Sequence, residues 1–318
     1  MKILLIKTSS MGDLIHTLPA LTEAHNKVPD LSFDWVVESS FAEIPRWHNA
    51  VNRVVPIALR KWRKNPLQAI SEHGPQNFLS ALRAEYYDYV IDAQGLLKSA
   101  VVAKIARGNK YGFSFDSARE PFASLFYRHK YHIAKDQHAI NRIRQLFSEI
   151  LNYKLEADVI DYGLESSSLI SNLEILERDK YLVFVHGTTS NAKCWQEQKW
   201  IALANLAAQK NFIVKLPWGN EEELKRAQRI KTLCSNVEVL PKMTLTAIAG
   251  VLYGAAFVVA VDTGLGHLSA ALNKPTISLY GKTDPKLIGT VGKRVHHVLD
   301  FQNIAAETVW SILESIII

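Results

Sequence analysis

Short apolar runs alternate with segments of helical periodicity along the whole chain, and this alternation constrains the fold most. The runs that have the length and composition of buried strands are residues 2–7, 33–37, 54–57, 89–91, 181–185, 212–216, 237–240, 257–261 and 276–279. Helical spacing is found at 14–21, 66–85, 95–106, 138–151, 199–210, 221–233, 244–253 and 264–272. Strand–helix alternation is typical of parallel sheets covered by helices. The predicted class is α/β with doubly wound sheets.

The chain length predicts two domains, because one hydrophobic core rarely grows beyond about 250–300 residues and this chain has 318. A polar, irregular stretch separates the two strand–helix series. We expect a Rossmann-like domain at 1–155, a linker at 156–180 and a second Rossmann-like domain at 181–303. Residues 304–318 are expected to form a C-terminal helix that packs back on the first domain. Two such domains facing each other would enclose a cleft, and open α/β sheets bind ligands beyond the carboxyl ends of their strands.

Several classes of protein are excluded by composition. The apolar start at 1–6 gives way at once to polar residues, unlike a signal peptide. No apolar stretch approaches the roughly 20 residues needed to cross a bilayer. Two cysteines, Cys194 and Cys234, cannot build a disulfide framework or a four-cysteine zinc site. We therefore expect a cytoplasmic protein.

The positive charge is concentrated in the first half. Residues 1–150 contain 20 Lys and Arg against 14 Asp and Glu, and this excess of positive residues equals the formal net charge of the whole chain, +6. The basic positions form two groups: Arg53, Arg60, Lys61, Arg63 and Lys64, then Arg119, Arg128, Lys130, Lys135, Arg142 and Arg144. Such a field attracts a phosphorylated lipid head group, an anionic membrane face or nucleic acid, although it is also compatible with an ordinary solvated surface.

A polar turn follows the first predicted strand at residues 9–13 and opens the next helix. Gly12 allows the backbone to approach a ligand, and Asp13 is placed to act in a ligand site. Ser10 or Asp13 could equally well cap the helix, since both residue types favour helix starts. The turn lacks the Gly-Lys-Ser/Thr ending of a P-loop.

Two further polar loops follow strands in the second half, at 186–195 and 261–268. The first combines hydroxyls, backbone amides and Lys193, which suits a diphosphate, but it could be an ordinary polar loop. The second runs from an apolar strand through Asp262, Thr263 and Gly264 into a helix, although His267 within it could be a structural histidine. No Asp-x-Asp pair ends a strand and no histidine spacing suits zinc, so we expect no metal and no cofactor.

Six segments together resemble glycosyltransferase family 9, and the likeness extends over nearly the whole chain. They are residues 7–21, 33–38, 91–96, 118–121, 216–219 and 262–264. The resemblance implies a GT-B fold whose first domain binds mainly the acceptor and whose second binds the nucleotide-sugar. It implies an inverting, metal-independent transfer of heptose from ADP-heptose to the Kdo sugar of a lipid A precursor. It also implies peripheral contact with the cytoplasmic face of the inner membrane.

The family's residue roles carry over only to matching positions. Asp13 would be the general base that deprotonates the acceptor hydroxyl. The donor would be bound by Thr188, Thr189, Lys193, Glu223, Met243, Asp262, Thr263, Gly264 and His267. The anionic acceptor would be bound by Ser10, Gly12, Arg60, Lys61, Arg63, Lys64 and Arg119.

Three alternatives compete with this hypothesis. The first is an enzyme of the same family that adds a later core heptose, and the second is a non-catalytic module that binds a nucleotide or an anionic lipid. The third, nucleic-acid binding, is suggested by charge alone. The chain has no recognisable reading helix or stacking motif, so we expect no nucleic-acid partner.

Overall fold

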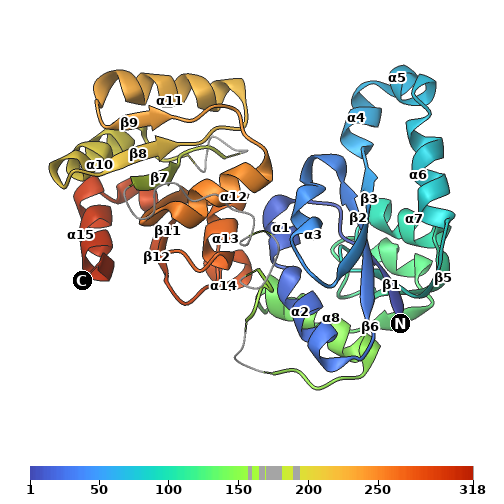
Figure 1. The fold of residues 1–318 in the computed structure, drawn as a ribbon. Helices are drawn as coiled ribbons and strands as arrows, with labels where there is room; N and C mark the ends of the chain where they lie inside the picture. Colours follow the sequence, from blue (N-terminus) through green and yellow to red (C-terminus); the bar gives the residue numbers. More distant parts are fainter. Residues whose placement is uncertain (157–159, 165–168, 170–180, 189–193, 318) are drawn as a thin grey trace. The chain divides into compact units, whose positions relative to one another are not determined.

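The computed structural model describes residues 1–156, 160–164, 169, 181–188 and 194–317. The chain divides into two compact units, Met1–Ser168 and Leu169–Ile318 (Figure 1). Most of the expected linker at 156–180 lies outside the described residues. Each unit is built on its own six-stranded parallel sheet.

The sheet of unit 1 has the order β3-β2-β1-β4-β5-β6, which is the strand order of a Rossmann fold. The strands are β1 (Lys2–Ile6), β2 (Ser32–Glu38), β3 (Val51–Ile57), β4 (Tyr86–Asp92), β5 (Arg107–Phe113) and β6 (His129–Tyr131). The strand order reverses between β1 and β4, which are paired in parallel from Ile3 with Tyr89 to Ile6 with Asp92. The loops that leave the carboxyl ends of these two strands therefore border the predicted ligand site.

The helices of unit 1 connect these strands. They are α1 (Met11–Ile15), α2 (Leu18–Lys27), α3 (Glu43–Arg46), α4 (Leu59–Lys64), α5 (Pro66–Ser71), α6 (Gly74–Arg83), α7 (Leu97–Ile105) and α8 (Ala139–Leu151), with the 3-10 helices η1 (Ser39–Phe41) and η2 (Pro121–Phe126). The segment at 66–85, expected to be helical, forms two helices. It is divided into α5 and α6 by His73, whose φ is +54°, and α4 precedes α5 across Asn65 and Pro66. These three helices project beyond the end of the sheet (Figure 1).

Unit 2 repeats the same topology. Its sheet has the order β12-β11-β10-β7-β8-β9, again with a reversal between its first strand and its fourth, β7 and β10. The strands are β7 (Tyr181–Val185), β8 (Ile213–Leu216), β9 (Val237–Val239), β10 (Phe257–Val261), β11 (Thr276–Tyr280) and β12 (Val295–Leu299). The helices are α10 (Glu197–Gln209), α11 (Glu221–Leu233), α12 (Leu245–Gly254), α13 (Gly264–Ala271), α14 (Pro285–Ile288) and α15 (Ala306–Ile317), with η4 (Phe301–Asn303).

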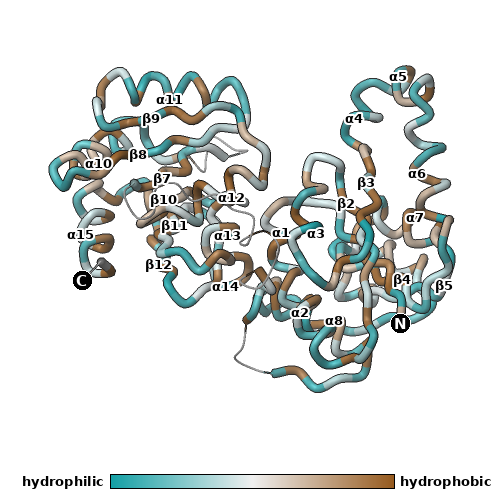
Figure 2. Tube along the Cα trace, in the orientation of Figure 1, coloured by the Kyte–Doolittle hydropathy of each residue, from teal (hydrophilic) through white to brown (hydrophobic). Residues whose placement is uncertain are grey.

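The burial of each strand explains how clearly the sequence predicts it. Every residue of β7 and β10 is buried, so these central strands read as continuous apolar runs. The outer helices are amphipathic instead. In α11, which is largely teal in Figure 2, Ala227 and Ile230 are the buried residues.

The C-terminal helix α15 belongs to unit 2 and packs in its core, while its expected packing on the first domain stays a prediction. Val309, Trp310 and Leu313 lie in the hydrophobic core of unit 2. Glu314 forms an ion pair with Lys210, which follows α10, at 3.1 Å. The apolar positions repeat every three or four residues, and the stripe they form is buried against its own unit. Across the described part of the chain, no helix combines the length and apolar character of a membrane span.

Candidate active site

The loop between β1 and α1 fixes the carboxylate of Asp13. The backbone nitrogen and the hydroxyl of Ser10 both donate hydrogen bonds to Asp13 Oδ2, at 2.8 and 2.9 Å. The hydroxyl of Thr17 donates to the Asp13 carbonyl at 2.8 Å. Asp13 is thus held at the start of its helix as the capping interpretation predicts. The bonds from Ser10 engage one carboxylate oxygen and leave Oδ1 for a ligand.

Charge keeps Asp13 ionised. Burial raises the pKa of this carboxyl, but the positive charge of Lys7, the two hydrogen bonds from Ser10 and the charge of Arg119 outweigh burial. The net result is a pKa below the ordinary value of an aspartate. Asp13 is therefore a carboxylate at neutral pH, ready to accept a proton.

Lys7 is a site residue that the sequence did not reveal. Its side chain is buried, and Nζ donates to the carbonyl of Ala93 at 3.0 Å. Burial lowers the pKa of Lys7, while the charges of Asp13 and Asp92 raise it and those of Arg119 and Arg142 lower it. The signal was present but ambiguous, because a lysine at the end of an apolar run normally marks the exit of the strand to solvent.

The loop after β4 is tied to the loop after β1. Gln94 Oε1 accepts hydrogen bonds from both the nitrogen and the hydroxyl of Thr8, each at 2.7 Å. Asp92 Oδ1 accepts from the nitrogen of Gln94 at 2.8 Å, and its Oδ2 accepts from the Tyr127 hydroxyl at 2.7 Å. Burial raises the pKa of Asp92. The carboxyl ends of β1 and β4, where the strand order reverses, therefore form a polar edge joined by hydrogen bonds, and Lys7 lies within it.

Arg119 belongs to this same edge. Its side chain is exposed, and its charge acts on both Lys7 and Asp13. Gly95 has a φ of +66°, and a Cβ there would lie 3.3 Å from the backbone nitrogen of Arg119. Only glycine therefore allows the loop after β4 to pass so close to the segment that carries Arg119.

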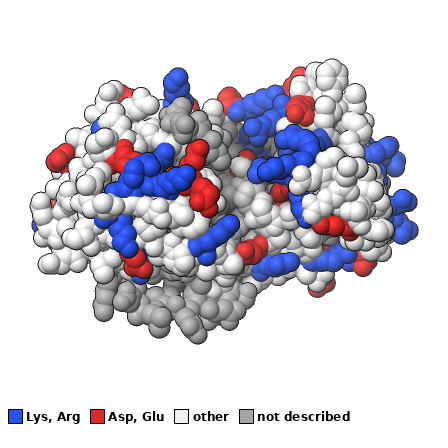
Figure 3. Space-filling view, turned by 90° about the horizontal axis from the view of Figure 1, so that it is seen from above, with Lys and Arg blue, Asp and Glu red and all other residues white. Residues whose placement is uncertain are grey.

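The other basic candidates lie farther along the sheet. Arg60, Lys61, Arg63 and Lys64 are exposed on α4, which follows the edge strand β3. The backbone nitrogen of Arg60 donates to Glu38 Oε1 at 3.2 Å, and Lys61 pairs with Glu72 at 3.0 Å. Basic side chains are prominent on the part of Figure 3 that belongs to unit 1. The structure thus places α4 beyond the carboxyl end of the sheet, two strands from β1.

The loop after β7 begins the second polar edge. The hydroxyl of Thr188 donates to the carbonyl of Asp262 at 3.1 Å, which links this loop to the end of β10. Thr189 and Lys193 lie outside the described residues. Arg226 of α11 donates to the carbonyl of His186 at 3.0 Å and to Cys194 Sγ at 3.3 Å, so it holds residues from both ends of the loop. Burial, assisted by the charge of Arg226, lowers the pKa of His186 to about 4 and keeps its ring neutral.

Glu223 is the acidic residue of α11 that faces the end of β7. Its Oε2 accepts from the nitrogen of Gly219 at 2.7 Å, and its Oε1 accepts from Asn220 Nδ2 at 3.0 Å. A Cβ on Gly187 would lie 2.3 Å from Glu223 Cδ. The carboxylate therefore lies directly against the backbone of the loop after β7, and a side chain at Gly187 would displace it.

The loop after β10 completes this edge. Thr263 is the N-cap of α13, Gly264 is its first residue, and His267 is buried in its first turn. The hydroxyl of Thr283, beyond the end of β11, donates to Asp262 Oδ2 at 2.6 Å. Thr283 was missed because no local pattern joins it to a residue 21 positions earlier. The edge therefore presents a helix N-terminus, hydroxyls and carboxylates.

Met243 lies half-buried between β9 and α12. Trp218 Nε1 donates to the carbonyl of Leu240 at 2.7 Å, so the loops after β8 and β9 are joined. Met243 is accordingly at the same sheet edge as Glu223, on the side of β9.

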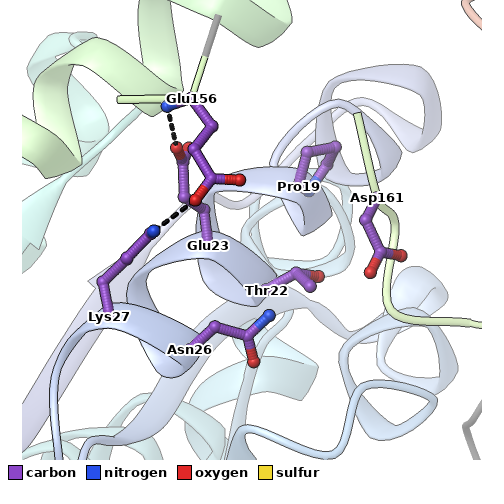
Figure 4. Close-up of a pocket in the computed structure, with 7 residues that line it drawn as sticks. All are labelled: Pro19, Thr22, Glu23, Asn26, Lys27, Glu156 and Asp161. Carbon is purple, nitrogen blue, oxygen red and sulfur yellow. Dashed lines mark hydrogen bonds and ion pairs between the residues drawn. The ribbon is translucent and has the colours of Figure 1, made fainter. Parts of the chain in front are cut away.

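A pocket on α2 in unit 1 has no catalytic character. It is lined by Pro19, Thr22, Glu23, Asn26, Lys27, Glu156 and Asp161 (Figure 4). Glu23 accepts from Arg144 and from the nitrogen of Glu156, and Lys27 pairs with Glu156. These pairs attach the segment after α8 to α2.

The described residues contain no group of three or more His, Cys, Asp and Glu side chains that could hold a metal ion.

Comparison with known proteins identifies the family of this chain. The model of glycosyltransferase family 9 (heptosyltransferase) matches residues 76–311. The chain belongs to glycosyltransferase family 9. Lipopolysaccharide heptosyltransferase 1 of Escherichia coli K12, which is similar to this family 9 enzyme, is 51% identical over 294 residues, or 92% of each chain.

Two solved structures are similar over almost their full length. E. coli heptosyltransferase WaaC with ADP has a TM-score of 0.94 at 47% identity, covering 99% of this chain and 100% of that one. The same protein with ADP-2-deoxy-2-fluoro heptose has a TM-score of 0.91 at 46% identity, covering 99% of each chain. These likenesses and the two Rossmann-like sheets confirm the expected GT-B type fold and a glycosyltransferase activity for this family 9 chain.

Proposed function

We propose that this enzyme transfers L-glycero-D-manno-heptose from ADP-heptose to a Kdo residue of Kdo-lipid A, with inversion at the anomeric carbon and without a metal ion. The observation that carries the proposal is the environment of Asp13, which keeps its carboxylate ionised and holds one of its oxygens by hydrogen bonds from Ser10. The high identity to lipopolysaccharide heptosyltransferase 1 supports the choice of substrates.

The polar edge of unit 2 is suited to ADP-heptose. Glu223, aligned by Gly219 and Asn220, would accept hydrogen bonds from the ribose hydroxyls. The N-terminus of α13, with Thr263 and Gly264, offers backbone N–H groups and a positive dipole end to the diphosphate. Thr188, Thr189 and Lys193 would complete the diphosphate site, Met243 would line the adenine pocket, and Asp262 and His267 would contact the sugar and phosphates.

The reaction is a single displacement. The acceptor hydroxyl oxygen bonds to the anomeric carbon from one face while the bond to the diphosphate oxygen breaks on the other, and ADP leaves. The hydroxyl proton passes to Asp13. Because a carboxylate of low pKa is a weak base, the proton moves late, when the attacking oxygen has become acidic. Lys193, the hydroxyls and the helix N-terminus meet the charge on the departing diphosphate, which makes a metal ion unnecessary.

The anionic acceptor matches the charge of unit 1. Arg119 lies at the same polar edge as Asp13 and is suited to the Kdo carboxylate, while Ser10 and Gly12 supply the loop around it. The basic face of α4, with Arg60, Lys61, Arg63 and Lys64, would meet phosphates of the lipid A part. An enzyme that adds a later core heptose would have less need of this carboxylate-binding charge beside the base.

Mass spectrometry of acceptor variants tests the proposal. Purified protein is incubated with ADP-heptose and with lipid A carrying no Kdo, one Kdo, two Kdo, phosphorylated Kdo, or Kdo that already bears one heptose, each with and without EDTA. One heptose added only where Kdo is present, with EDTA having no effect, is the expected result. Transfer only to an acceptor that already bears heptose would instead establish the later core step, and loss of activity in EDTA that added Mg²⁺ restores would disprove the metal-free mechanism.

A further inference from the structure

Unit 1 exposes large apolar side chains on two neighbouring helices, α7 and η2. Leu97, Val101 and Ile105 follow one another at intervals of four residues on α7 and are 42%, 44% and 37% exposed. Phe122 and Leu125 of η2 are 62% and 68% exposed. Single exposed apolar residues are common on protein surfaces, but contiguous groups mark interaction sites.

Packing makes these residues one surface. The helices α7 and η2 lie against each other, and the backbone nitrogen of Leu97 donates to Glu120 Oε2 at 2.6 Å, just before η2. Residues three apart in a 3-10 helix share a face, so Phe122 and Leu125 point outward together while Ala123 and Ser124 are buried. The ring of Phe115, itself 49% exposed, meets that of Phe122 edge to face at 5.7 Å. We call these six side chains the apolar band: Leu97, Val101, Ile105, Phe115, Phe122 and Leu125.

The charge around the apolar band is mainly positive. Lys98 and Lys104 are exposed on α7, and Arg128 is exposed just beyond η2. The acidic residues in the same segments are Asp116 and Glu120, and Glu120 is engaged by the nitrogen of Leu97. An apolar surface bordered by lysine and arginine matches the interface of an anionic bilayer, where apolar groups enter the acyl boundary and cations meet phosphates.

The apolar band adjoins the acceptor edge of unit 1. Arg119 lies between Phe115 and Phe122 in the chain, and the nitrogen of Glu120 donates to the Gly95 carbonyl at 2.9 Å. The loop that carries Arg119 is thereby attached to the end of β4, which pairs with β1. A surface resting on Phe115 and Phe122 would hold this edge close to the level of the lipid head groups.

We propose that the apolar band docks unit 1 on an anionic lipid bilayer, so that a glycolipid can present its sugar to Asp13 while its acyl chains stay in the membrane. The choice of a glycolipid rests on the proposed function. The docking itself rests on the exposed side chains and their cationic border.

Vesicle co-sedimentation tests the docking independently of catalysis. The full chain is mixed with vesicles of phosphatidylethanolamine and phosphatidylglycerol, or of phosphatidylcholine alone, and F122S/L125S is compared with a matched pair from unit 2, I213S/L233S. The unit 2 pair removes apolar side chains that are 44% and 65% exposed. We expect binding to the anionic vesicles to fall at least about tenfold in F122S/L125S, from the apolar area lost, and to be unchanged in I213S/L233S. Melting curves of both variants establish that they are folded.

Three results would overturn the proposal. The first is equal vesicle binding of the wild type and F122S/L125S. The second is that vesicle binding is lost in another double variant, L67S/I70S on α5, and kept in F122S/L125S. The third is that the wild type is a dimer which F122S/L125S alone converts to a monomer, with vesicle binding unaltered. Activity separates this proposal from the proposed function. F122S/L125S should keep wild-type turnover on a lipid-free Kdo saccharide and lose at least about tenfold on vesicle-embedded acceptor. Failure of the wild type on both acceptors would reject the proposed substrates and leave the vesicle result standing.

Discussion

The two polar edges of this molecule lie at the same topological position of the same strand order, yet their chemistry differs. At the edge of unit 1, the positive charges of Lys7 and Arg119 act on the carboxylate of Asp13, and the Thr8–Gln94 hydrogen bonds join the neighbouring loops. At the edge of unit 2, hydroxyls, glycines and a neutral His186 surround a helix N-terminus. The Rossmann strand order therefore fixes only where a site can form, and a few side chains determine the chemistry of each edge.

The largest effect is expected from Asp13→Asn, which removes the base and keeps the shape of the unit 1 edge. Asparagine cannot take the acceptor proton, so kcat should fall about 10²–10⁴-fold. Single-turnover measurements of heptose transfer provide the test. An unchanged kcat would show that another group accepts the proton.

Lys7→Met probes the electrostatics of the same edge. Asp13 must be ionised to act, and its depressed pKa means that activity is lost only as pH falls through that low value. Without the charge of Lys7 the pKa of Asp13 should rise, and the acid limb of the kcat/KM profile should move to higher pH. A shift of one pH unit would lower kcat/KM about tenfold at pH values below the shifted limb.

The control for Lys7→Met is Lys2→Met, at the opposite end of β1. Lys2 pairs with Glu85 at 3.2 Å, and the length of β1 separates it from the Asp13 loop. Its replacement should leave the acid limb in place. If both variants shifted the limb equally, the effect would come from general charge and not from the unit 1 edge.

Gly187→Ala tests the close approach at the unit 2 edge. The added Cβ would lie 2.3 Å from Glu223 Cδ and displace the carboxylate, so the KM for ADP-heptose should rise several-fold. Overpacking of this kind also costs about 1–3 kcal/mol of stability, measurable by denaturant unfolding. Gly219→Ala is the matched control, because its Cβ would meet Glu223 Oε2 at 3.5 Å, an ordinary contact. Equal KM values for the two variants would contradict the role of Glu223.

The smallest effect is expected from Thr283→Val, which removes the hydrogen bond to Asp262 Oδ2. One hydrogen bond to a charged group contributes about 1.5–3 kcal/mol at most, and partial compensation by water reduces it. A two- to tenfold rise in the KM for ADP-heptose is expected, with wild-type behaviour in Thr283→Ser. No difference between the Val and Ser variants would remove Thr283 from the donor site.

The sequence predicts the central strands well and the outer ones poorly. Residues 181–185 and 257–261 were predicted with the observed bounds, because strands buried on both faces are continuously apolar. The strands β5, β6 and β12 were missed. Each has exposed or half-buried positions occupied by Arg, Lys, His or Tyr, so no apolar run marks them.

The candidate site shows the same limit of sequence reasoning. Asp13 and Asp262 were selected because each follows a predicted strand within a short polar turn, whereas Glu223 was selected only through the resemblance to glycosyltransferase family 9. Lys7 and Thr283 act through contacts with residues 86 and 21 positions away. Such pairs depend on which strands are neighbours in the sheet, and the periodicity of a single strand carries no information about its neighbours.

The central claim is that the two edges divide the work, with proton acceptance in unit 1 and nucleotide binding in unit 2. Titration calorimetry of ADP against Asp13→Asn and Glu223→Gln tests this division most directly. The account predicts an unchanged Kd for Asp13→Asn and a Kd at least about fivefold weaker for Glu223→Gln, the effect of about one hydrogen bond. An equal loss of ADP affinity in both variants, or a loss confined to Asp13→Asn, would contradict it.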